Sequence, residues 1–124
     1  MATKCQCCAA APCLIFPCSG GSDVGELTDR AARKLTRDGA GRMYCLAGIG
    51  GRVSGIMATT ESAAAVLALD GCPQDCAKKT LEQAGFKKFL HLRLSDLRLA
   101  KGKSPATAAR VASVAAKGKK LLVG

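Results

Sequence analysis

Cysteine is the residue type through which this chain could do chemistry, because its 124 residues include eight cysteines and a single histidine. Four of these cysteines stand at or just after the ends of short apolar runs: Cys18, Cys45, Cys72 and Cys76. Cys72 and Cys76 are four residues apart, so both can lie on one face at the start of a helix. Four thiolates around a tetrahedral Zn²⁺, each at about 2.3 Å, make a closed metal site. The cysteines therefore predict a zinc site, provided that the fold brings the apolar runs side by side.

Alternating apolar runs and helical patterns predict how these cysteines are positioned. Strands are expected over 12–18, 42–48, 64–70 and 86–94, and helices over 19–39, 72–85, 104–120 and briefly near the end of a glycine-bearing loop at 49–62. Short apolar strands joined by helices are typical of a parallel sheet with helices on both faces. We predict a single three-layer α/β domain over 12–124, with a mostly parallel four-stranded sheet in the Rossmann- or flavodoxin-like order 2-1-3-4. The carboxyl ends of neighbouring strands, about 4.8 Å apart, would then gather the four cysteines at one edge.

Two helices are expected to start at this same edge. Asp23 is predicted to cap the first of them, with Glu26 as its capping-box partner. Cys72 is predicted at the cap of the second, with Pro73 in its first turn and Gly85 at its end. The positive ends of both helices would favour thiolate over thiol at the cysteines. A redox cysteine would gain from the same field, so the field does not choose between metal binding and redox chemistry.

Small and polar residues beside the cysteines could support the site. The turn after the first strand could offer backbone N–H groups to a sulfur or an anion, and its residues are Ser19, Gly20, Gly21 and Ser22. Asp70 and Gly71 precede Cys72, and Asp70 could orient the turn or a ligand through backbone hydrogen bonds. An ordinary tight turn explains both segments equally well. His91 is expected to be a half-buried strand residue, and Cys13 a small core residue of the first strand.

Four segments resemble the DGC-domain family, which is named for its Asp-Gly-Cys motif. These segments read CSGGSDVGELTDRAARKL, CLAGIGG, ALDGCPQDCAKKTLEQAG and HLRLSDL, and the resemblance extends over residues 13–97 or so. It implies a zinc-binding protein that uses four cysteines. By motif these are again Cys18, Cys45, Cys72 and Cys76. The resemblance implies no particular biochemical activity.

Several functions remain compatible with these cysteines. A closed four-thiolate zinc site leaves no position for a reactive water, which favours a zinc-binding protein over a zinc hydrolase. A thiol-redox protein would instead use Cys72 and Cys76 as a reactive pair, with Cys18 or Cys45 as the resolving thiol. An Fe–S or metal-trafficking protein is a third possibility, because thiolates bind iron and copper as well as zinc.

The two ends of the chain differ from its centre. Residues 1–11 are expected to form a flexible leader whose Cys5, Cys7 and Cys8 could act as accessory thiols. Residues 1–77 carry 7 basic and 7 acidic side chains, whereas 78–124 carry 12 basic and 2 acidic ones, so the net charge of +10 resides in 78–124. That basic part could bind nucleic acid or an acidic protein. No stretch approaches the about 20 apolar residues of a membrane span, and clustered cysteines in an α/β pattern favour a cytoplasmic protein.

Overall fold

The structure is a computed structural model and describes residues 11–124. Its elements in chain order are β1 (Cys13–Pro17), α1 (Asp23–Arg37), β2 (Arg42–Met43), α2 (Leu46–Gly50), α3 (Ser54–Glu61), β3 (Ala65–Asp70), α4 (Cys76–Gln83), β4 (Leu90–Arg93), the 3₁₀-helix η2 (Leu94–Leu97) and α5 (Ala108–Val123). None of the helices in this described part is long and apolar enough to cross a membrane.

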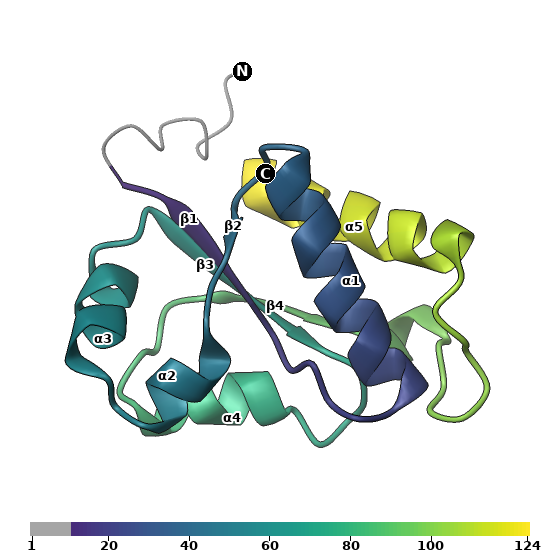
Figure 1. Cartoon of the computed structure of the whole chain (residues 1–124), viewed down its shortest axis with the longest axis horizontal. Helices are drawn as coiled ribbons and strands as arrows, with labels where there is room; N and C mark the ends of the chain where they lie inside the picture. The colour runs from purple at the N-terminus through teal and green to yellow at the C-terminus, as the bar shows by residue number, and fades with distance from the viewer. Residues whose placement is uncertain (1–10) are drawn as a thin grey trace.

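The strands form one parallel sheet in the order β2-β1-β3-β4 (Figure 1). α1 and α5 cover one face of the sheet, and α2, α3 and α4 lie on the other side. The predicted three-layer α/β architecture and the predicted strand order are therefore confirmed. Because β1 and β3 are the two central strands, the chain segments that follow them lie next to each other at the carboxyl edge of the sheet.

The central strands are apolar on both faces because both faces are buried. Ile15 and Leu67 point into the core formed with α1 and α5, whereas Phe16 and Ala68 point into the core formed with α2 and α4. This explains why β1 and β3 read as continuous apolar runs rather than alternating ones. Cys13, which opens β1, is only 2% exposed, as expected for a position at the start of a buried strand.

α1 buries the stripe that its helical spacing predicts, including Val24, Leu27 and Leu35. Its cap differs from the prediction: the side chain of Ser22, not Asp23, accepts the hydrogen bond from the Gly25 N–H. Asp23 is already the first helical residue. Its carboxylate accepts hydrogen bonds from the backbone N–H groups of Gly102 and Ser104, about eighty residues further on.

Two elements at the carboxyl edge also start later or end earlier than predicted. β2 comprises only Arg42 and Met43, and Cys45 follows it as the residue before α2. α4 begins at Cys76 rather than at Cys72, because Asp75 adopts a left-handed conformation with φ 55° that no continuous helix can contain. Gly85 follows the end of α4 with φ +97°, as a helix-terminating glycine does.

The last helix is shifted by a few residues from its predicted range of 104–120. Thr107 caps it by accepting a hydrogen bond from the Arg110 N–H, and the helix continues to Val123. Ser104 stays outside the helix because its N–H is held by Asp23 and its hydroxyl accepts a bond from the Ala100 N–H.

Candidate functional site

The four predicted cysteine ligands all follow adjacent strands. Cys18 comes directly after β1, Cys45 lies two residues after β2, and Cys72 lies two residues after β3. Cys76 is the first residue of α4, one turn of chain beyond Cys72. Because β2, β1 and β3 are neighbours in a parallel sheet, all four residues are placed at its carboxyl edge.

None of these four cysteines forms a disulfide, and all are at least partly accessible. Cys45 and Cys76 are exposed, while Cys18 and Cys72 are intermediate. The backbone of Cys18 is fixed, because its N–H donates to the carbonyl of Leu69 at 2.8 Å and so ties the end of β1 to β3. Its sulfur lies 3.5 Å from the hydroxyl of Thr28.

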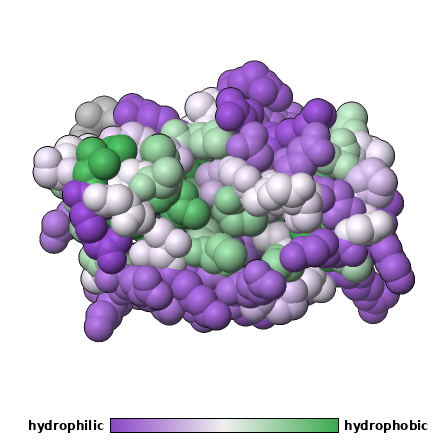
Figure 2. All heavy atoms as spheres, turned by 60° about the horizontal axis from the view of Figure 1, so that its bottom comes forward, coloured by the Kyte–Doolittle hydropathy of each residue, from purple (hydrophilic) through white to green (hydrophobic). Residues whose placement is uncertain are grey.

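Cys18 and Cys45 line one cavity of about 460 Å³ at this edge. Thr80 lines the same cavity, and its hydroxyl donates to the carbonyl of Cys76 one helical turn earlier. Figure 2 shows the surface on the side where α2 and α4 lie. Hydrophobic residues lie near the centre of this view, and hydrophilic residues surround them. Cys72 and Cys76 themselves do not line the cavity. Within residues 11–124, no three cysteine sulfurs lie within 4.8 Å of one another.

Asp70 fixes the start of α4 and therefore the position of Cys76. It is 1% exposed, and its Oδ1 accepts the N–H of Ala77 at 2.7 Å while its Oδ2 accepts the N–H of Lys78 at 3.0 Å. These are two of the N–H groups that a helix leaves without partners in its first turn. The turn between Asp70 and α4 is thus closed by the Asp70 side chain, and a role for Asp70 toward a bound ligand stays a prediction.

Gly71 is required by the close approach of the turn to α1. A Cβ atom at this position would lie 2.9 Å from the backbone carbonyl carbon and oxygen of Val24. Gly25, one residue along α1, is crowded in the same way, because its Cβ would lie 2.4 Å from the carbonyl oxygen of Gly20. Both glycines therefore let the two loops that carry Cys18 and Cys72 fold against the start of α1.

The turn of residues 19–22 was predicted as a possible nest of backbone N–H groups. One of its N–H groups is already used, because Ser19 donates to the hydroxyl of Thr28 at 3.1 Å. The hydroxyl of Ser19 donates to Asp29, and that of Ser22 caps α1. Gly20 and Gly21 are exposed, and a role for their N–H groups toward a ligand stays a prediction.

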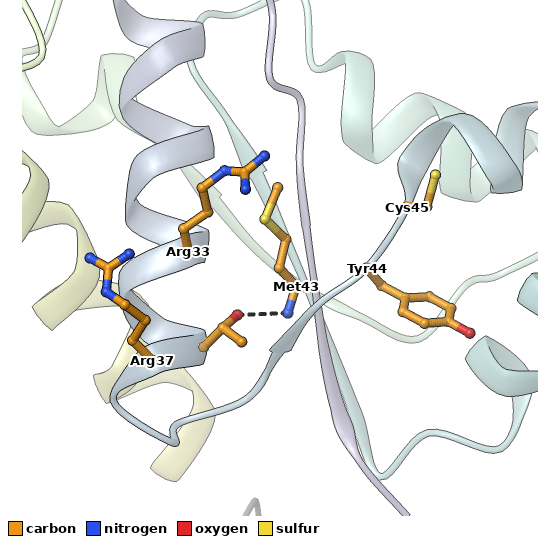
Figure 3. Close-up of a pocket in the computed structure, with 6 residues that line it drawn as sticks. Arg33, Arg37, Met43, Tyr44 and Cys45 are labelled. Carbon is orange, nitrogen blue, oxygen red and sulfur yellow. Dashed lines mark hydrogen bonds between the residues drawn. The ribbon is translucent and has the colours of Figure 1, made fainter.

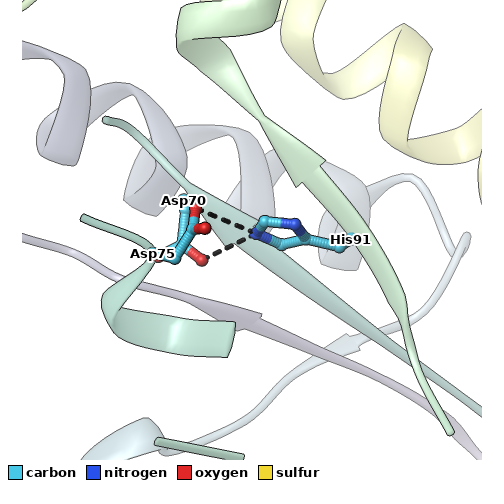
Figure 4. Close-up of side chains that lie close together, drawn as sticks. All are labelled: Asp70, Asp75 and His91. Atoms are coloured by element: carbon cyan, nitrogen blue, oxygen red, sulfur yellow. Dashed lines mark hydrogen bonds and ion pairs between the residues drawn. The ribbon is translucent and has the colours of Figure 1, made fainter. Parts of the chain in front are cut away.

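A polar cluster that the sequence did not reveal lies beside the cysteines, at the ends of β3 and β4. His91 Nε2 hydrogen-bonds Asp70 Oδ2 at 2.8 Å and lies 3.7 Å from Asp75 Oδ1 (Figure 4). Arg93 donates two hydrogen bonds to Asp75, at 2.7 and 2.5 Å. These bonds hold the pKa of the Asp75 carboxyl below its usual value, against the opposing effect of burial.

Asp70, Asp75 and His91 are the one trio of metal-binding side chains in the described part of the chain whose ligand atoms all lie within 4.8 Å. Their hydrogen-bonding capacity is nevertheless in use. Both oxygens of Asp70 accept backbone N–H groups, and both oxygens of Asp75 face the guanidinium of Arg93. A cation here would have to displace a positive charge, so the cluster is better explained as the element that anchors α4 to β4.

Part of this cluster could have been found in the sequence. His91 and Arg93 are two residues apart on one strand, so they project from the same face. In the register of the sheet, Arg93 lies beside Asp70. His91 is half-buried in β4, as predicted, with 19% of its side chain exposed. Asp75 reaches the cluster through a left-handed backbone conformation, which no local sequence pattern predicts.

Comparison with known proteins identifies the family of this chain. The model of the DGC domain matches residues 14–117, which is most of the chain. The chain belongs to the DGC family. The anaerobic and virulence modulator AnvM of Pseudomonas aeruginosa is 40% identical over 83 residues, which cover 67% of this chain and 63% of AnvM. This DGC domain thus matches less than two thirds of the length of that relative, and no solved structure matches it.

Each residue of the motif that names the DGC family has a distinct place in this fold. Asp70 holds the first turn of α4, Gly71 lets the turn lie against α1, and Cys72 follows them at the carboxyl edge of the sheet. Cys5, Cys7 and Cys8, which were predicted as accessory thiols, lie outside the described residues.

Proposed function

We propose that this DGC domain binds one Zn²⁺ through Cys18, Cys45, Cys72 and Cys76. The observation that carries the proposal is that these four accessible, unpaired thiols follow the carboxyl ends of three adjacent parallel strands. Functional groups of open parallel sheets collect at this edge. Thiolate sulfur is also the ligand that structural zinc sites use most.

The donor set fits zinc in number and type. Tetrahedral coordination at about 2.3 Å requires sulfurs roughly 3.8 Å apart, so metal binding draws the cysteine side chains closer together. Cys72 lies in the turn before α4, and Cys45 is the residue before α2, so both stand outside regular secondary structure. Cys18 and Cys76 lie on firmly held backbone, because the former is bonded to β3 and the latter follows the anchored turn. We infer that metal binding moves the side chains of Cys45 and Cys72 toward Cys18 and Cys76.

A site of four thiolates has no vacant position at which zinc could activate water. The proposed role is therefore metal binding rather than hydrolysis. A relative that is named as a modulator fits such a role, since a closed metal site contributes stability and shape rather than chemistry. The cytoplasm, where thiols stay reduced, is the compartment in which such a site is retained.

Elemental analysis combined with thiol counting on freshly purified protein tests the proposal. We expect about one zinc per chain, with four thiols that react only after chelation. Serine variants of Cys5, Cys7 and Cys8 are the matched control and should keep the full zinc content. Serine variants at Cys72 or Cys76 should lose it.

Two outcomes would contradict the zinc proposal. A folded, metal-free protein with four freely reactive thiols and a reversible Cys72–Cys76 disulfide would identify a thiol-redox protein. A brown protein with iron, prepared without oxygen, would identify an Fe–S protein instead.

A further inference from the structure

The outer face of α1 borders a groove that is lined mainly by basic side chains. It has a volume of about 470 Å³ and lies between α1 and the start of α5. The residues that line it, here called the basic groove, are Arg30, Arg33, Lys34, Arg37, Ala108 and Val111. Arg30, Arg33, Lys34 and Arg37 are spaced i, i+3, i+4 and i+7, so they form one stripe along about 10 Å of helix. Neither aspartate nor glutamate lines this groove.

The positive charge of the stripe is only partly neutralised by its own helix. Three of the basic residues make ion pairs four residues apart: Glu26–Arg30, Asp29–Arg33 and Lys34–Asp38. Such solvent-exposed pairs are weak and are exchanged easily.

Two guanidinium groups of the stripe keep donors for a ligand. Arg33 is bonded to Asp29 through its Nε, which leaves its terminal nitrogens without a partner among residues 11–124. Arg37 makes no hydrogen bond or ion pair with any of these residues. The stripe therefore offers several donors and at least one uncompensated charge.

The groove continues past α1 into a second cavity of about 650 Å³. Arg33 and Arg37 border both spaces, and Met43, Tyr44 and Cys45 line the far side of the second one. In Figure 3 the side chain of Arg33 extends from α1 toward Met43, and the segment with Tyr44 and Cys45 continues away from α1. The two arginines thus form a ridge between a basic space and a more apolar one.

We propose that the basic groove binds an acidic, amphipathic segment of a partner protein. Carboxylates on one face of a partner helix, repeated every three or four residues, would match the spacing of the four basic side chains. The exposed Ala108 would meet an aliphatic side chain between those carboxylates, and the largely buried Val111 lies at the bottom of the groove. A single small anion would engage only part of the stripe. Single-stranded nucleic acid fits less well, because the groove contains no aromatic side chain on which a base could stack.

The test uses a fluorescently labelled, capped peptide of about 15 residues with glutamates and leucines at helical spacing. Its affinity for the full chain is measured by fluorescence anisotropy at low salt. The variant Arg33→Gln/Arg37→Gln removes two charges of the ridge. The matched control Lys119→Gln/Lys120→Gln removes two exposed charges of α5 that do not line the groove. A peptide with glutamine in place of glutamate tests the need for negative charge.

We expect the arginine variant to weaken peptide binding about tenfold, and the lysine control to change it less than about twofold. The glutamine peptide should not bind. Equal losses in both variants would overturn the proposal, because they would show attraction to net charge alone. No binding at low salt would also overturn it, as would displacement of the peptide by a DNA duplex of equal charge. The assay reads peptide binding and not zinc content, so failure of this proposal can be distinguished from failure of the proposed metal site.

Discussion

Replacing Asp70 by asparagine should destabilise the fold by about 1.5–3.5 kcal/mol. Asp70 is 1% exposed, and its two oxygens accept the N–H groups of Ala77 at 2.7 Å and Lys78 at 3.0 Å. Asparagine keeps one oxygen, but its NH₂ group must face the other N–H donor. A backbone donor then loses its acceptor in a buried position, which costs about 1–3 kcal/mol. Loss of the charge at the helix start adds about 0.5 kcal/mol.

Urea denaturation followed by circular dichroism measures this change. The predicted loss is a large fraction of the about 5–15 kcal/mol that stabilises a typical domain. Asp96→Asn is the control, because Asp96 has 66% of its side chain exposed and lies 3.7 Å from Arg93. The control should change the free energy of unfolding by less than about 0.5 kcal/mol.

On the proposed zinc site, the same substitution should also weaken metal binding, because Asp70 holds the start of the helix that carries Cys76. Loss of such a supporting group typically lowers metal affinity by about 10- to 100-fold. If Asp70→Asn unfolds at the same urea concentration as Asp96→Asn, then the two backbone hydrogen bonds do not hold α4, and the reasoning about the motif is wrong.

Two further predictions concern the supports of the same edge. Gly71→Ala should lower the free energy of unfolding, measured by urea denaturation, by about 1–3 kcal/mol, because the added Cβ would lie 2.9 Å from the backbone of Val24. The control Gly21→Ala places its Cβ in open space and should lower the stability far less. Equal losses in the two variants would contradict this explanation. The N–H groups of Gly102 and Ser104 hold the pKa of Asp23 below its usual 3.8. Its carboxylate therefore adds stability that is present above about pH 4 and is lost as the pH falls through the folded-state pKa. Asp23→Asn should be less stable than the natural protein at neutral pH, and the difference should vanish in strong acid; a difference that is independent of pH would refute the assignment.

The sequence predicts those parts of this fold that depend on local pattern. Continuous apolar runs identify β1 and β3 as buried central strands, and the helical spacing of Leu27 and Leu35 identifies the inner face of α1. The strand order 2-1-3-4 is the one typical of Rossmann- and flavodoxin-like sheets, in which the connection from β2 to β3 passes β1. The placement of cysteines after three strands follows from the same order.

Features that depend on distant contacts could not be predicted. Asp23 resembles a helix cap, but it holds a loop that lies about eighty residues away, and Ser22 takes the capping role. The local sequence predicts that α4 starts at Cys72, which is one turn too early. Asp75 instead adopts a left-handed backbone, and Arg93 of β4 holds its side chain. In both cases a side chain from elsewhere in the fold decides a boundary that the local sequence leaves open.

X-ray absorption at the zinc edge tests the central claim most directly, because it identifies the atoms around the metal. The account predicts a shell of four sulfurs at about 2.3 Å in the zinc-loaded protein, with no nitrogen or oxygen ligand. A shell with nitrogen and oxygen at about 2.0 Å would contradict it. That result would exclude a site of four thiolates and would make Asp70, Asp75 and His91 the first residues to replace, because their ligand atoms are the one trio that lies close together among the described residues.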